Sequence, residues 1–305
     1  MAFWQSRFAL PVEERTGVAP PELVQFLALD VINQGIPAEP RAATAHAGVL
    51  AEVRAVLAEL PQSVKRRLSE RLAGIYLAED FGGTGFTDTI ADDSGRKVAA
   101  FVVLDPNVLE KRTANEWGTW KESSPFTPDP RYALREKLED AAHDNRRQAI
   151  QYILLHELGH VLSVGGHFHP DWNFTPSQVP PGESDPFFDL SWTLDRAKNE
   201  YVSKYAETLP EAKQVRYYFG ARLAPTDMAR TYEHLEHTPF PTLYATTHPG
   251  DDFAEAFANY VHVVMLGKPF EITIVEDGKI VKRYGPCWDE PRCAEKRKIL
   301  EEFLR

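Results

Sequence analysis

The segment Gln151-Tyr-Ile-Leu-Leu-His156-Glu157-Leu-Gly-His160-Val-Leu162 decides the fold that the sequence predicts. Apolar residues surround the polar ones at helical spacing and a Gly-Gly pair supplies a stop, so we expect a helix over 146–164. Residues four apart lie on one face of a helix, and His156 and His160 can therefore direct two imidazole nitrogens at one zinc ion. Glu157 lies beside them, where it can handle a proton. The plain alternative is a pair of surface histidines on an ordinary helix.

Three places could supply the third protein ligand that a catalytic zinc site needs beside its open position for water. A metzincin would have Gly and His where this chain has Ser163 and Gly166, so that pattern fails. His167 and His169 are close in sequence, but they lie in a loop beyond the Gly-Gly stop. The third place is a later helix, predicted over 251–266.

This later helix carries a polar stripe among apolar residues. Four polar residues recur at steps of three or four, namely Asp251, Glu255, Asn259 and His262. Such steps place them on one face of the helix. A solvated acidic first turn explains Asp251, but it explains poorly Glu255, which stands between apolar neighbours. We therefore predict that a carboxylate of this helix binds the metal ion, with both residues open as the ligand.

These motifs together resemble the gluzincin metallopeptidases, in particular the anthrax toxin lethal factor type. The matching residues are His156 to His160, then Tyr244, Asp251 and Phe253-Ala-Glu-Ala-Phe257, a small part of the chain. The resemblance implies a zincin fold with zinc, Asp251 as the third ligand, Glu255 as the carboxylate that supports a ligating histidine, and Tyr244 as a hydroxyl that assists at the transition state. The family has Glu where this chain has Asp251, so Glu255 remains the alternative ligand.

The predicted function is hydrolysis of a peptide bond in a peptide or protein substrate by zinc-activated water. Glu157 would accept the proton of the water and deliver it to the leaving amine, while Tyr244 would donate to the oxyanion. Tyr232 and His234 are alternates for that donor. Two other functions remain open: a zinc amidase acting on a non-peptide or cell-wall amide, and a non-catalytic binding protein on a zincin fold, which would be expected to lack Glu157.

The charge, the apolar runs and the cysteines limit the partners and the cellular compartments that we expect. With 34 Lys+Arg against 45 Asp+Glu, the net charge of −11 argues against nucleic acid or an anionic membrane as a partner. No apolar run approaches the roughly 18 to 20 residues that cross a bilayer, and the start lacks a secretory pattern. We expect a soluble protein, cytoplasmic as written and extracytoplasmic if a signal was removed; the oligomeric state stays open. Cys287 and Cys293 fit a small disulfide loop and free thiols equally well.

The other segments predict an α+β chain, a mostly helical zincin-like fold with a small mixed sheet. Helices are expected over 21–32, 44–60 and 61–72. They would form an N-terminal helical region (1–72) before a catalytic domain (73–305), or both would be one continuous domain.

Short strands are expected over 75–77 and 97–104, the second as a candidate edge strand for an extended peptide. Gly82-Gly-Thr-Gly85 predicts a hairpin turn without chemistry, because no Gly-Lys-Ser/Thr follows it. Later segments predict a loop over 117–130, one helix or two over 131–164, and helical spacing over 190–236. They also predict a hairpin over 271–284 turning at Asp277-Gly278, and a closing helix over 290–304.

Overall fold

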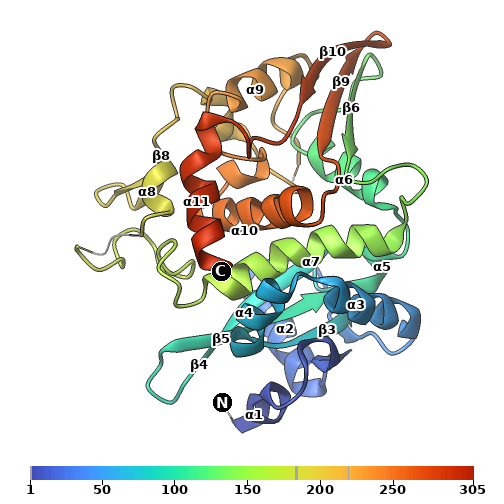
Figure 1. Cartoon of the computed structure of the whole chain (residues 1–305), viewed down its shortest axis with the longest axis vertical. Coiled ribbons are helices and arrows are strands. Elements are labelled where there is room, and N and C mark those ends of the chain that lie inside the picture. Colours follow the sequence, from blue (N-terminus) through green and yellow to red (C-terminus); the bar gives the residue numbers. More distant parts are fainter. Residues whose placement is uncertain (1, 183–184, 219) are drawn as a thin grey trace. The chain divides into compact units, whose positions relative to one another are not determined.

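The computed structural model describes residues 2–182, 185–218 and 220–305 (Figure 1). Helices alternate with strands that form small sheets, which confirms the α+β class. The chain divides into two compact units: unit 1 holds residues 1–113 and 145–165, and unit 2 holds residues 114–144 and 166–305. No helix in the described ranges is long and apolar enough to cross a membrane.

The sheet of unit 1 contains β1 (Thr16–Val18), β3 (Leu72–Glu79), β5 (Lys97–Leu104) and β4 (Gly85–Ala91), in that order, and the short β2 (Arg41–Ala42) also pairs with β3. β1 and β5 are parallel to β3, whereas β4 is antiparallel to β5. The pairing of β1 with β3 joins the two sides of the predicted division at residue 72. That division therefore does not coincide with the compact units.

The strand predicted over 97–104 forms with those bounds, but its position in the sheet and the turn before it differ from the prediction. β5 lies between β3 and β4, so it is a central strand, and β4 is the edge strand on that side of the sheet. The hairpin predicted at Gly82–Gly85 is wrong, because β3 and β4 are not paired with each other. The hairpin turn lies later in the chain, between the antiparallel strands β4 and β5.

Helices cover both faces of this sheet, which explains its nearly continuous apolar strands. α1 (Ala2–Phe8) and α2 (Pro21–Gln34) pack on the face that carries Tyr76, Phe101 and Val103. On the other face, α3 (Ala47–Glu59), α4 (Gln62–Arg71) and α7 (Arg146–Ser163) pack together, with α5 (Pro106–Leu109) beside them. Asn145 caps α7 by accepting the Gln148 N–H, as a favoured N-cap residue does. The helices predicted over 21–32, 44–60 and 61–72 are thus confirmed as α2, α3 and α4.

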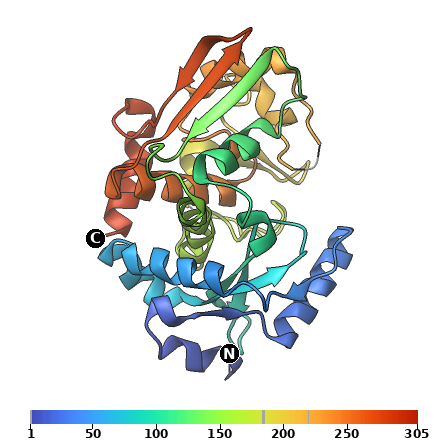
Figure 2. The same ribbon diagram turned by 90° about the vertical axis from the view of Figure 1, so that its right-hand side faces the viewer.

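Unit 2 is built on an antiparallel sheet of β6 (Tyr132–Lys137), β9 (Glu271–Glu276) and β10 (Lys279–Tyr284). Figure 2 shows the green β6 beside the two red strands, although they are far apart in sequence. The hairpin predicted over 271–284 forms, with Asp277 and Gly278 both at positive φ in its turn. α6 (Ala114–Ser123) packs on β6, and α10 (Pro249–Tyr260) packs on α11 (Ala294–Phe303).

Three predictions for unit 2 are wrong. The predicted loop over 117–130 contains most of α6, and the predicted helix over 131–164 begins with the strand β6. The segment 190–236 is only partly helical, with α9 (Met228–Leu235) near its end. Before α9, the end of α8 (Phe188–Ser191) leads into a hairpin of β7 (Trp192–Asp195) and β8 (Glu200–Ser203). Its turn needs Asn199 in the left-handed region, which asparagine tolerates.

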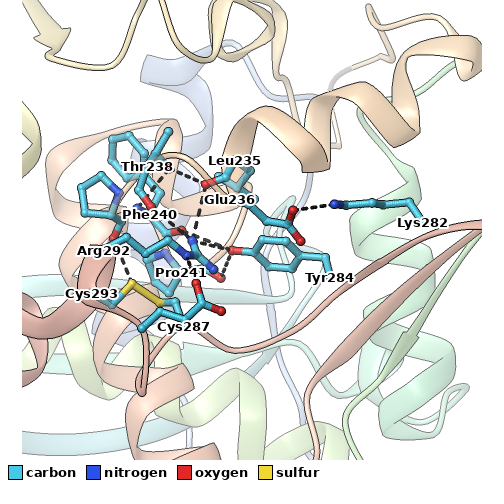
Figure 3. Close-up of polar contacts among 12 residues, drawn as sticks. Leu235, Glu236, Thr238, Phe240, Pro241, Lys282, Tyr284, Cys287, Arg292 and Cys293 are labelled. Carbon is cyan, nitrogen blue, oxygen red and sulfur yellow. Dashed lines mark hydrogen bonds and ion pairs between the residues drawn. A yellow bond between two sulfur atoms is a disulfide. The ribbon is translucent and has the colours of Figure 1, made fainter.

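Near the C-terminus, a disulfide loop and an arginine side chain hold the segment that follows α9 (Figure 3). Cys287 and Cys293 form a disulfide, which decides between the two alternatives left open by the sequence. Arg292, inside that loop, donates to the backbone carbonyls of Leu235, Thr238 and Phe240. These bonds fix the stretch that runs into the short 3-10 turn η4 (Tyr244–Thr246).

Candidate metal centre

The two histidines of the motif lie together on α7, in its buried stretch. Their Nε2 atoms are 3.2 Å apart, and the rings are nearly perpendicular at 81°. Two nitrogens bound to one tetrahedral zinc at about 2.0–2.1 Å would stand about 3.3 Å apart. The spacing of His156 and His160 therefore suits two ligands of one ion.

Asp251 offers a third ligand atom. The ligand atoms of His156, His160 and Asp251 all lie within 4.8 Å of one another, and each residue is partly exposed. In the described part of the chain, no other group of three or more His, Cys, Asp or Glu side chains has this spacing, and neither His167 nor His169 belongs to it. Two imidazole nitrogens and a carboxylate oxygen are a donor set that zinc binds, so the residues fit that ion.

The carboxylate of Asp251 is held at the start of α10. The His248 side chain accepts the Gly250 N–H at 3.1 Å and so caps the helix. Thr247 donates its hydroxyl to Asp251 Oδ2 at 2.8 Å. A carboxylate in the first turn is also stabilised by the helix dipole. Thr247 thus binds one oxygen of Asp251 within the first turn of the helix.

Glu255 lies one turn further along α10 and is only 1% exposed. Lys121 donates to its Oε1 at 3.0 Å, and Thr242 donates its hydroxyl to Oε2 at 2.6 Å. Both carboxylate oxygens therefore accept hydrogen bonds from side chains of unit 2. Glu255 does not belong to the group of ligand atoms formed by the described residues.

Tyr244 lies in η4, half-buried among aromatic rings. Its ring meets that of Tyr217 edge-on at 4.7 Å, and the Lys121 ammonium lies 4.6 Å from the ring centre. Burial raises the pKa of Tyr244 well above its usual value, and the negative charge of Asp251 raises it further. The phenol therefore stays protonated at neutral pH and is available as a hydrogen-bond donor.

The two alternates for Tyr244 are engaged elsewhere. Tyr232 is fully buried and donates its hydroxyl to Glu122 at 2.7 Å. His234 Nδ1 is 2.9 Å from a carboxylate oxygen of Glu211. These contacts hold α9 against its neighbours and account for both residues.

Glu157 is 8% exposed and lies against the edge strand β4. Thr87 donates its hydroxyl to Glu157 Oε2 at 2.6 Å. Gly85 makes room for the carboxylate, because a Cβ at this position would lie 2.4 Å from Oε1. Neither Gly85 nor Thr87 was predicted as part of the site. The sequence offered no signal for them, because Gly85 belongs to a segment that predicts a turn and Thr87 to no motif.

The ligand atoms of His156, His160 and Asp251 form a donor set that a divalent cation can bind. Comparisons of this chain with protein-family models, with curated proteins and with solved structures return no match. The function proposed below therefore depends on the residues of the site and on no relative.

Proposed function

We propose that this protein is a zinc-dependent hydrolase with a zincin-like fold that cleaves a peptide bond. The grouping of His156, His160 and Asp251, with Glu157 on the helix of the two histidines, carries the proposal. Three protein ligands leave a fourth position for water, as catalytic zinc sites do and structural ones do not. Asp251 is preferred over Glu255 as the third ligand, because both oxygens of Glu255 already accept hydrogen bonds.

The residues around the ligands supply the acid–base chemistry. His156, His160 and Asp251 would hold the zinc ion, which would supply a Lewis acid that lowers the pKa of a bound water to about 7 and polarises a carbonyl. Glu157 takes up the proton and later delivers it to the leaving amine. Thr87 binds one oxygen of Glu157 and so orients the other. Tyr244 donates its phenol proton in a hydrogen bond to the oxyanion.

The edge strand β4 supports a peptide as the substrate. Among the described strands, β4 pairs only with β5, so its other edge can bind an extended chain through backbone hydrogen bonds. The same strand carries Gly85 and Thr87, the two residues that contact Glu157. A peptide on this edge would therefore lie beside the proposed base.

Zinc content and hydrolysis test the proposal together. The isolated protein should carry about one zinc per chain, and it should cleave an unfolded protein such as casein until a chelator removes the metal. Re-added zinc should restore cleavage, and His160→Ala serves as a variant that cannot be restored. A protein that was never exposed to chelator or acid and yet holds no zinc would contradict the proposal. Cleavage of a simple amide but of no peptide would indicate the amidase instead.

Gly85→Ala should slow hydrolysis by about tenfold or more while zinc stays bound, because the new Cβ displaces the Glu157 carboxylate that must accept a proton. The side chain of Glu157 ends in a flexible carboxylate, so stability should fall only by the order of one hydrogen bond, about 1 kcal/mol. Steady-state kinetics and chemical denaturation measure the two effects. Gly285→Ala is the control, since a Cβ there meets nothing within 4 Å. Equal kinetics in the two variants would contradict the role given to Gly85.

A further inference from the structure

A buried ammonium joins two parts of the candidate site in unit 2. The side chain of Lys121, on α6, is only 5% exposed. Its Nζ lies 3.0 Å from Glu255 on α10 and 4.6 Å from the centre of the Tyr244 ring in η4. One cation therefore contacts both the proposed oxyanion donor and the helix that carries Asp251.

The surroundings of this ammonium are strongly anionic. Glu122 lies 3.6 Å from Lys121 Nζ and accepts hydrogen bonds from two tyrosine hydroxyls. Glu136 is buried nearby, and its Oε2 has no hydrogen-bond partner among the described residues. Burial, followed by the charge of Glu122, raises the pKa of Glu136 well above its usual value. Lys121 thus lies within ion-pair distance of two carboxyl groups, those of Glu122 and Glu255.

Stability alone does not require a lysine at this position. A buried ion pair contributes little net stability compared with apolar residues of the same size, because both charges lose their hydration. A charged pair does, however, fix direction, since the ammonium and carboxylate must meet at hydrogen-bond distance. The ring of Tyr244 adds a second constraint, because a cation is attracted to the face of an aromatic ring.

We propose that Lys121 is a positioning residue for the metal centre, holding Glu255 and the ring of Tyr244 in one fixed arrangement. Glu255 and Asp251 are four residues apart on α10, so a tether on the first sets the rotation of the helix and the direction of the second. The same ammonium sets where the Tyr244 hydroxyl points. This role rests on the proposed function, because Lys121 can position a zinc ligand only if Asp251 binds zinc.

Lys121→Met tests the role, since methionine keeps an unbranched apolar chain without the charge. We expect zinc affinity to fall by the 10- to 100-fold that is typical when a supporting partner of a ligand is lost. The kcat should fall by about tenfold or more with little change in KM, because the misplaced Tyr244 acts only in the transition state. Zinc dissociation constants come from competition with a chelator, and the thermal transition of the metal-free protein reports folding.

The double variant Lys121→Met/Glu255→Gln keeps the test valid if the single variant fails to fold, because it also removes one of the uncompensated charges. If Lys121 acts through Glu255, the double variant should bind zinc as Glu255→Gln alone does. Lys268→Met is the matched control, because it removes another lysine of unit 2 that is paired with a glutamate, Glu139, at 3.0 Å. Its zinc affinity should match that of the wild type.

Two results would overturn the role of Lys121 while the proposed function stands. One is a folded Lys121→Met protein with the zinc affinity and kcat of the wild type. The other is a double variant in which the two losses of zinc affinity multiply, as they do for independent residues. A wild-type protein without zinc would instead overturn the proposed function, and the role of Lys121 with it.

Discussion

Glu157→Gln should retain zinc and lose nearly all hydrolysis. The amide has the size of the carboxylate, and its oxygen can still accept the hydroxyl of Thr87, so the local structure should persist. It cannot accept a proton, and loss of a general base costs about 10²- to 10⁴-fold in rate. Single-turnover cleavage of a peptide, measured beside the zinc content of the same sample, separates lost chemistry from lost metal.

Thr87→Val is the comparison for this variant. It removes the hydroxyl that orients Glu157 but leaves the base in place, so its rate should lie between those of the wild type and Glu157→Gln. If Glu157→Gln cleaves at the native rate with zinc bound, Glu157 is not the base. Retained zinc with no cleavage in the wild type as well would indicate a binding protein.

Asp251→Ala should weaken zinc binding far more than Glu255→Ala. Residues four apart rise about 6 Å along a helix, so only one of these carboxylates reaches an ion at about 2 Å. Asp251 is grouped with the two histidines, whereas Glu255 is bound by Lys121 and Thr242. The loss at Glu255 should therefore stay within about 10- to 100-fold, and the loss at Asp251 should exceed it.

Chelator competition on the two alanine variants measures this difference directly. Their thermal transitions in the absence of metal give the control, because Glu255→Ala also leaves the buried ammonium of Lys121 without that partner. A larger loss of zinc affinity at Glu255 than at Asp251 would reverse the assignment of the third ligand. The histidine pair would keep its role in either case.

Local pattern was enough for the parts of the fold that sequence analysis predicted correctly. β5 forms at 97–104 because its run of β-branched and aromatic residues is buried on both faces. The Asp277-Gly278 turn was visible because few residues accept positive φ at two successive positions. α7 was visible from the apolar residues on both sides of His156 and His160.

One contact explains why α6 and β6 were both mistaken. Gly118 and the prolines that follow it made the segment 117–130 look like a loop, yet a Cβ at Gly118 would lie 2.2 Å from Glu136 Oε2. Glu136 points inward from β6, so the strand lacks the alternation of apolar residues that would have identified it. The glycine in the helix is explained by the buried glutamate on the strand, because only a residue without a Cβ leaves room for that carboxyl group.

In the candidate site, too, a local pattern predicted some residues and not others. His156, Glu157 and His160 follow from helical spacing within one short segment. Thr87 and Lys121 contact residues far away in the sequence, so no local pattern could indicate them. The residues of the candidate metal centre were predictable, whereas most of the residues that contact them were not.

The division of the chain also bears on how the protein is made. Residues 145–165 belong to the same unit as residues 1–113, so the ribosome must first synthesise the whole of 114–144. Until α7 has emerged, the buried face of β5 that carries Val102 and Leu104 lacks one of its covering helices. A nascent chain at that stage exposes apolar surface, and it is a candidate client for chaperones. An expression fragment of unit 1 therefore has to keep α7, joined through a linker in place of 114–144.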